Sequence, residues 1–142
     1  MTRFAVALLA ALPACVVYDT DHVVVEEPPP YVNYAPIINY AEAGCYWDGY
    51  YGDYIWYFTG DVDDPNGVYD VVSVWADVYD GPSGAWIDSF ELYPTNDVYV
   101  WYSDWLGAST YVDCNYHGYE VDIVAYDAMD VYTATTILPI YY

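Results

Sequence analysis

The residues best suited to chemistry are aspartates and asparagines in three short segments between hydrophobic runs. They are Asp61, Asp63, Asp64 and Asn66 in the first segment, Asn96 and Asp97 in the second, and Asp127 and Asp130 in the third. Carboxylate and amide oxygens are the ligands that Ca2+ prefers, in sets of about six to eight. If folding brings these segments together, a calcium site is expected, with Asp61, Asp63, Asp64, Asn66, Asp127 and Asp130 as its ligands.

The local pattern before Gly67 does not match an EF-hand loop. With Gly67 at the sixth position of such a loop, Val62 takes the first position, where an acidic ligand is required. Asp and Asn also form turns without a metal, because their side chains accept hydrogen bonds from nearby backbone N–H groups. Two interpretations therefore stay open, a calcium site and a set of turn-forming residues.

Residues for enzymatic catalysis are scarce. The chain has two histidines, His22 and His117, and no lysine. No serine stands in the glycine-flanked context of a nucleophile elbow. Pairs of carboxylates can hydrolyse glycosides, but such pairs are unavoidable among 22 acidic residues. We therefore expect a protein that is not an enzyme.

The N-terminus has the pattern of an export signal. Arg3 precedes an apolar run from Phe4 to Leu12, which is too short to span a bilayer stably. The following sequence, LPAC over residues 12–15, resembles the bacterial lipobox. The resemblance implies that residues 1–14 are removed and that Cys15 carries a lipid. An ordinary secretory signal and a retained N-terminal helix are the alternatives.

The residue after Cys15 bears on localisation. It is Val16, whereas an aspartate there would resemble an inner-membrane retention signal. The lipobox resemblance therefore implies a protein held in the outer membrane or at the cell surface through its lipid.

The three cysteines support this interpretation, since an odd count in an exported protein leaves one to be explained. With Cys15 bound to lipid, Cys45 and Cys114 form a natural disulfide pair in an oxidising compartment. The alternative is a pair of buried free thiols.

Charge excludes some partners. The full chain has a formal charge of −21, and loss of Arg3 with the signal would leave −22 and no Lys or Arg. Nucleic acid and anionic membrane surfaces are excluded as direct partners, because both require cationic side chains.

Aromatic residues form 21% of the chain, and they suit half-buried strand surfaces. Two dense clusters, over residues 46–57 and 101–111, offer platforms for an extracellular protein or a glycan. The alternative is that these rings form the core and cover the sheet.

Three regions follow from composition: a signal peptide (1–14), an acidic tether with three prolines (15–33) and an all-β domain (34–142). Alternating runs rich in Val, Ile, Tyr and Trp predict seven antiparallel strands, at 34–40, 54–62, 68–79, 85–93, 98–103, 119–127 and 131–138. In the third, Val72, Val74, Ala76 and Val78 are expected to share the buried face. Seven such strands predict a two-sheet sandwich.

Three segments carry a resemblance to bacterial immunoglobulin-like and fibronectin type III-like domains: DVDDPNGV over 61–68, VVSVWADV over 71–78 and YEVDIVAYD over 119–127. The resemblance implies a seven-stranded immunoglobulin-like sandwich. In that fold the connections that hold Cys45 and Cys114 lie at one end, and the three Asp-rich connections lie at the other.

The expected function is therefore a structural or adhesive role for a non-enzymatic, lipid-anchored envelope protein. The alternative is a calcium- or carbohydrate-binding module on the same domain.

Overall fold

The computed structural model describes residues 30–142. The chain divides into two units, Met1–Pro30 and Tyr31–Tyr142, and the fold described below is that of the second unit. Outside the described residues lie the predicted signal peptide, the predicted lipidation site Cys15, His22 and all of the predicted tether before Pro30. Within residues 30–142 no helix is long and apolar enough to cross a membrane.

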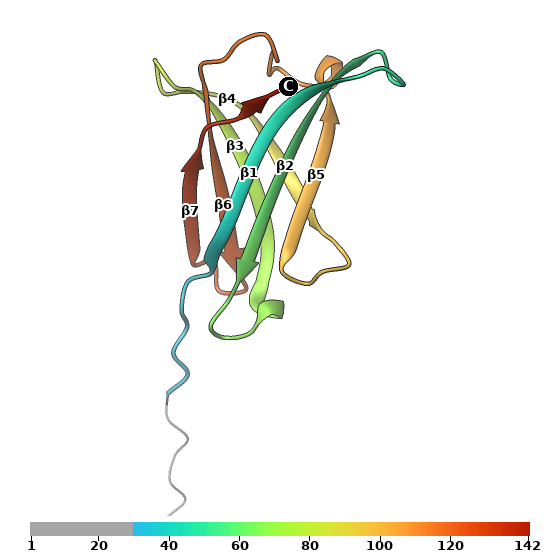
Figure 1. The fold of residues 1–142 in the computed structure, drawn as a ribbon. Helices are drawn as coiled ribbons and strands as arrows, with labels where there is room; N and C mark the ends of the chain where they lie inside the picture. Colours follow the sequence, from blue (N-terminus) through green and yellow to red (C-terminus); the bar gives the residue numbers. More distant parts are fainter. Residues whose placement is uncertain (1–29) are drawn as a thin grey trace, which may run out of the picture. The chain divides into compact units, whose positions relative to one another are not determined.

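The domain is all-β, as predicted, with eight strands rather than seven (Figure 1). The strands are β1 (Ile37–Asp48), β2 (Asp53–Asp63), β3 (Val71–Asp80), β4 (Ala85–Pro94), β5 (Val100–Leu106), β6 (Tyr119–Asp127), β7 (Tyr132–Ile137) and β8 (Ile140–Tyr141). Two 3-10 turns, η1 (Val68–Asp70) and η2 (Gly107–Ser109), precede β3 and follow β5.

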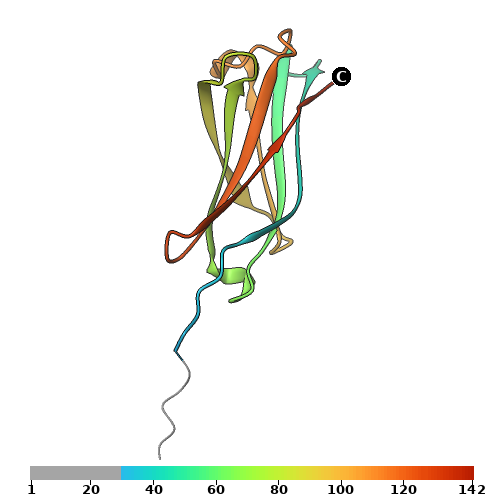
Figure 2. The same ribbon diagram turned by 90° about the vertical axis from the view of Figure 1, so that its left-hand side faces the viewer.

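Strand pairing forms one mixed sheet in the order β7-β6-β3-β4-β5-β2-β1-β8. Every pair is antiparallel except β1 with β8, which is parallel. β4 and β5 are joined only through Tyr93 with Tyr102 and Pro94 with Trp101. The sheet therefore bends sharply there and curls, so that β1 also contacts β6 and β7 (Figure 2).

Two predicted strands differ clearly from the structure. Residues 34–40 were predicted as a strand, but β1 begins at Ile37 and continues to Asp48 because it pairs with β2 along its whole length. Residues 68–70 were predicted to open a strand, but they form η1. The short strand β8 was not predicted, since two residues carry no detectable period.

The core follows the predicted two-residue period with one correction. Val74, Ala76 and Val78 of β3 are fully buried, as predicted, but Val72 is 53% exposed. A register shift between Val71 and Ser73 gives the inward position to Val71 instead. Such a bulge moves one residue out of alternation.

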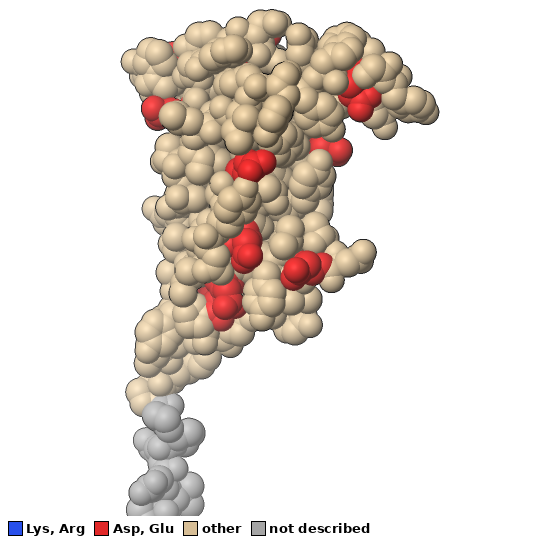
Figure 3. All heavy atoms as spheres, in the orientation of Figure 1, with Lys and Arg blue, Asp and Glu red and all other residues tan. Residues whose placement is uncertain are grey.

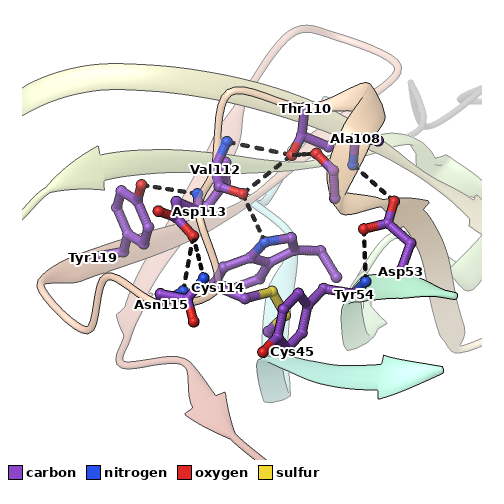
Figure 4. The surroundings of a disulfide bond; sticks show 12 residues. Cys45, Asp53, Tyr54, Ala108, Thr110, Val112, Asp113, Cys114, Asn115 and Tyr119 are labelled. Atoms are coloured by element: carbon purple, nitrogen blue, oxygen red, sulfur yellow. Dashed lines mark hydrogen bonds between the residues drawn. A yellow bond between two sulfur atoms is a disulfide. The ribbon is translucent and has the colours of Figure 1, made fainter. Parts of the chain in front are cut away.

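The disulfide between Cys45 and Cys114 is present, and both residues are buried (Figure 4). Cys45 lies within β1 rather than in the predicted connection after it, and Cys114 lies in the β5–β6 loop. The bond therefore fastens a long loop to a strand. Trp56 pairs with Cys45 in the β1–β2 register, and its indole N–H donates a hydrogen bond of 3.0 Å to the carbonyl oxygen of Val112.

Candidate metal centre

Two aspartates are placed at the end of the core by strand alternation. In β2, Trp56, Phe58 and Val62 point inward, and the same two-residue period carries on to Asp64 just after the strand. In β6, alternate positions from Val121 to Ala125 point inward, and the next inward position is Asp127. Asp64 is 3% exposed and Asp127 is fully buried.

Asp70 of η1 joins these two aspartates. The pairing of β3 with β6 sets Asp127 opposite Val71, the residue after Asp70. The backbone N–H of Ala128 also donates to the carbonyl oxygen of Asp70, at 2.9 Å. One side-chain oxygen from each of Asp64, Asp70 and Asp127 lies within 4.8 Å of the other two. We call these three residues the aspartate cluster.

Backbone hydrogen bonds hold two of the three carboxylates in place. Asp64 Oδ1 accepts the N–H of Asn66 at 2.7 Å. Asp127 Oδ1 accepts the N–H groups of Met129 and Val131, at 2.8 and 2.9 Å. These bonds fix the two side chains while leaving oxygens of the cluster available to a ligand.

The pKa of Asp127 is lowered from its ordinary value of 3.8. Burial alone raises this pKa, but hydrogen bonds from the Asn33 side chain and from the backbone N–H groups of Val131 and Met129 outweigh burial. The Asp127 carboxyl is therefore ionised at neutral pH.

Three buried oxygen atoms at this end have no hydrogen-bond partner within residues 30–142: Asp64 Oδ2, Asp70 Oδ2 and Asn33 Oδ1. Residues 30–142 also contain no Lys or Arg, and Figure 3 shows acidic side chains over one face with no basic side chain among them. An unsatisfied buried acceptor costs about 1–3 kcal/mol, and buried charges are paired or bind metals. The aspartate cluster therefore has the donor chemistry of a hard-cation site.

Six of the predicted oxygen donors do not belong to the aspartate cluster: Asp61, Asp63, Asn66, Asn96, Asp97 and Asp130. Asp61 and Asp63 occupy the opposite phase of the alternation from Asp64, so they face away from the core. Asn66 binds backbone atoms of Val32 and Tyr34.

The remaining loop residues have local roles. Asp97 accepts the N–H of Tyr99 in the β4–β5 connection, at 3.2 Å. Asp130 adopts a left-handed conformation, with φ of 61°, in the β6–β7 turn. For these residues the turn-forming interpretation fits better than the metal-ligand interpretation.

Asp70 and Asn33 were not among the predicted site residues. Asp70 was assigned to a strand, and the signal that could have singled it out is its position next to Val71, the first core residue of β3. Asn33 was assigned to the tether, and nothing local marks it, because its partner Asp127 is 94 positions away.

The aromatic clusters divide between core and surface. Trp56 and Trp101 are buried, whereas Trp47, Tyr50 and Tyr51 near the β1–β2 turn are each more than half exposed. The exposed rings meet edge to face, with 87° between the planes of Tyr50 and Tyr51. A flat platform for sugar stacking is not formed by this pair.

His117, the histidine that was considered for catalysis, lies in the β5–β6 loop. Its ring stacks on Tyr141 with 4.2 Å between centroids. His117 precedes β6, whereas Asp127 of the aspartate cluster is the last residue of that strand, so the nine residues of β6 separate the two.

Comparisons with family models, with curated proteins and with solved structures found no match to this chain.

Proposed function

We propose that this chain is a non-enzymatic, lipid-anchored protein of the cell envelope whose β domain binds a calcium ion. Its role there is structural or adhesive. Export and anchoring depend on the N-terminal sequence, with cleavage before Cys15 and lipid on that residue. Calcium binding depends on the aspartate cluster.

The observation that carries calcium binding is the aspartate cluster without a cationic side chain. Three carboxylates lie within 4.8 Å of one another, and two of them are at least 97% buried. All available donors are oxygens, which excludes the sulfur and nitrogen ligands typical of zinc and copper sites. Carboxylates of this number suit Ca2+, whereas Mg2+ commonly takes only one or two and keeps several waters.

An immunoglobulin-like architecture is part of this proposal. In strand order, β7, β6, β3 and β4 hydrogen-bond as one group, and β5, β2 and β1 as another. This is the grouping of strands G, F, C and C′ and of strands E, B and A in immunoglobulin-like sandwiches. The parallel strand β8 and the β4–β5 pairing are additions to it.

Calcium binding is favoured over carbohydrate binding on this domain. A carbohydrate platform needs exposed rings that present a common face, whereas the ring planes of Trp47 and Tyr54 meet at 80° and those of Tyr50 and Tyr51 at 87°. The aspartate cluster, in contrast, has its oxygens already gathered.

Thermal unfolding of the full chain in excess chelator and in Ca2+ tests the calcium proposal. At about 100 times the Kd, a ligand that binds only the folded state stabilises it by about 2.7 kcal/mol. For a domain of this size the melting temperature should then rise by about 10 °C or more. Asp127→Asn should abolish the rise, and Asp104→Asn should keep it, because Asp104 is exposed on β5. An unchanged melting temperature in wild type would contradict calcium binding.

Membrane fractionation tests the anchor. Wild type should sediment with membranes, and Cys15→Ser should be released, since the acyl chains contribute about 0.8 kcal/mol for each buried CH2 group. Retention of Cys15→Ser in the membrane fraction would contradict lipid anchoring.

A further inference from the structure

The segment Tyr31–Tyr34, where the chain enters the domain, lies against the aspartate cluster. The side-chain amide of Asn33 donates from Nδ2 to Asp127 Oδ2 at 2.5 Å. Its other polar atom, Oδ1, is buried and has no partner in the described part of the chain. Amide oxygens are ordinary ligands of Ca2+. Asn33 therefore offers a neutral oxygen next to the Asp127 carboxylate.

A second set of bonds ties the same segment to the β2–β3 loop. Asn66 donates from Nδ2 to the carbonyl oxygen of Val32 at 2.8 Å, and its Oδ1 accepts the N–H of Tyr34 at 2.7 Å. Asn66 is itself positioned by Asp64, whose Oδ1 accepts its backbone N–H. Asp64 thus belongs both to the aspartate cluster and to the loop that holds the segment.

From these contacts we infer that Asn33 is a calcium ligand and that calcium binding fastens the segment Tyr31–Tyr34 to the domain. The inference rests on the proposed calcium site. Without a cation, the segment is held beside mutually repelling carboxylates by a few exposed or half-buried hydrogen bonds. A bound cation neutralises the repulsion and gives Asn33 Oδ1 and the carboxylate oxygens of Asp64 and Asp70 a shared partner.

Calcium would control the order of the N-terminal end of the domain. Tyr31 begins the folded unit, so calcium-dependent binding of residues 31–34 would determine whether these residues stay packed against the domain. Extracellular calcium would then stiffen the junction between this domain and whatever precedes it.

The test combines calcium titration of the full chain with hydrogen exchange of residues 31–34. In wild type, Ca2+ should slow amide exchange in this segment, most clearly at Tyr34, whose N–H is bound to Asn66. Asn33→Ala should weaken Ca2+ binding by about tenfold or more, since mutation of a residue that only hydrogen-bonds to a metal ligand already lowers metal affinity by about that factor. It should also abolish the calcium-dependent protection.

Two variants separate ligation from other roles of Asn33. Asn33→Asp keeps a side-chain oxygen but loses the Nδ2 donor, so it should retain Ca2+ binding and protection. Asn39→Ala is the matched control, because Asn39 is exposed and its amide binds Asp61, outside the aspartate cluster. It should behave as wild type.

The outcomes discriminate between the two proposals. If Asn33→Ala binds Ca2+ as tightly as wild type, Asn33 is not a ligand. If Ca2+ does not change the amide exchange of residues 31–34 in wild type, calcium binding does not fasten the segment. Either result overturns this inference but leaves the proposed calcium site intact. If Asn33→Asp loses as much affinity as Asn33→Ala, Asn33 acts through its donor and is not a ligand. If wild type binds neither Ca2+ nor Tb3+, a luminescent ion used as a substitute for Ca2+, both proposals are overturned.

Discussion

Asp64, just after β2, and Asp127, the last residue of β6, lie at equivalent positions of two strands that are not neighbours in the sheet. Each comes two residues after a fully buried hydrophobic residue, Val62 in β2 and Ala125 in β6. The alternation that builds the core thus delivers two carboxylates to the same end of it. Their burial without Lys or Arg is the physical basis of the proposed cation site.

The pH dependence of stability should reflect Asp127. Its pKa is lower in the folded protein than the ordinary 3.8, so folding favours the ionised carboxyl. The resulting stabilisation is complete above the unfolded pKa and is lost as the pH falls through the lower folded value. In chelator, the free energy of unfolding of wild type should therefore fall below about pH 4.

NMR titration of the Asp127 carboxyl carbon measures this directly and needs no variant. A midpoint below 3.8 is expected, and a midpoint above it would contradict the hydrogen-bonded, ionised state. Asp104→Asn, which alters an exposed residue of β5, should leave the Asp127 midpoint unchanged.

Alkaline stability should depend on Tyr141 of β8. Burial, followed by the charges of Tyr119 and Tyr116, raises its pKa from 10.0 to about 12. Because folding disfavours the tyrosinate, the stabilisation is complete below about pH 10 and is lost as the pH rises through about 12. Ultraviolet titration of tyrosinate should show a component near pH 12 that Tyr141→Phe removes. If Tyr141→Phe leaves the titration curve unchanged, the assignment is wrong.

Reduction of the Cys45–Cys114 disulfide should destabilise the domain strongly. The bond joins residues 69 positions apart, and the chain-entropy model assigns about 4 kcal/mol to a loop of that length. Urea unfolding with and without reductant measures the difference. A Cys45→Ala/Cys114→Ala variant should be equally destabilised and insensitive to reductant. A reductant effect in that variant would point to another cause.

Gly44 of β1 should tolerate no side chain. A Cβ at this position would lie 2.7 Å from the carbonyl oxygen of Ile140 and from the ring of Tyr57. Gly44→Ala should therefore cost about 1–3 kcal/mol in unfolding free energy, as overpacking does. Gly49→Ala is the control, since nothing lies within 4 Å of its Cβ position. Equal stability of the two variants would argue against close packing of β8 on β1.

Much of the fold could be predicted because alternation is a local property. The boundaries of β6, at 119 and 127, coincide with the predicted strand, and β3 buries three of its four predicted residues. The exception, Val72, turns outward at a bulge. Bulges arise from the register between two strands, and a single strand's sequence carries little sign of them.

The candidate site could be predicted only in part. Asp64 and Asp127 were identified as oxygen donors in segments expected to converge, and the aspartate cluster contains both. Asp61 and Asp63 were identified by the same argument, but strand alternation directs them away from it. Composition identifies which residues carry oxygen ligands, whereas the inward or outward position of each residue in its strand decides which of these oxygens lie close together.

The sequence alone determined the chemistry available to this protein: many carboxylates, no Lys or Arg after Arg3, and alternating hydrophobic runs that require an all-β core. Tertiary structure decided which oxygens gather. Asp70 meets Asp127 through the β3–β6 register, and Asn33 reaches Asp127 across 94 positions of chain. Such contacts depend on how distant strands pair and how the sheet curls, because local patterns fix each strand's faces but not its neighbours.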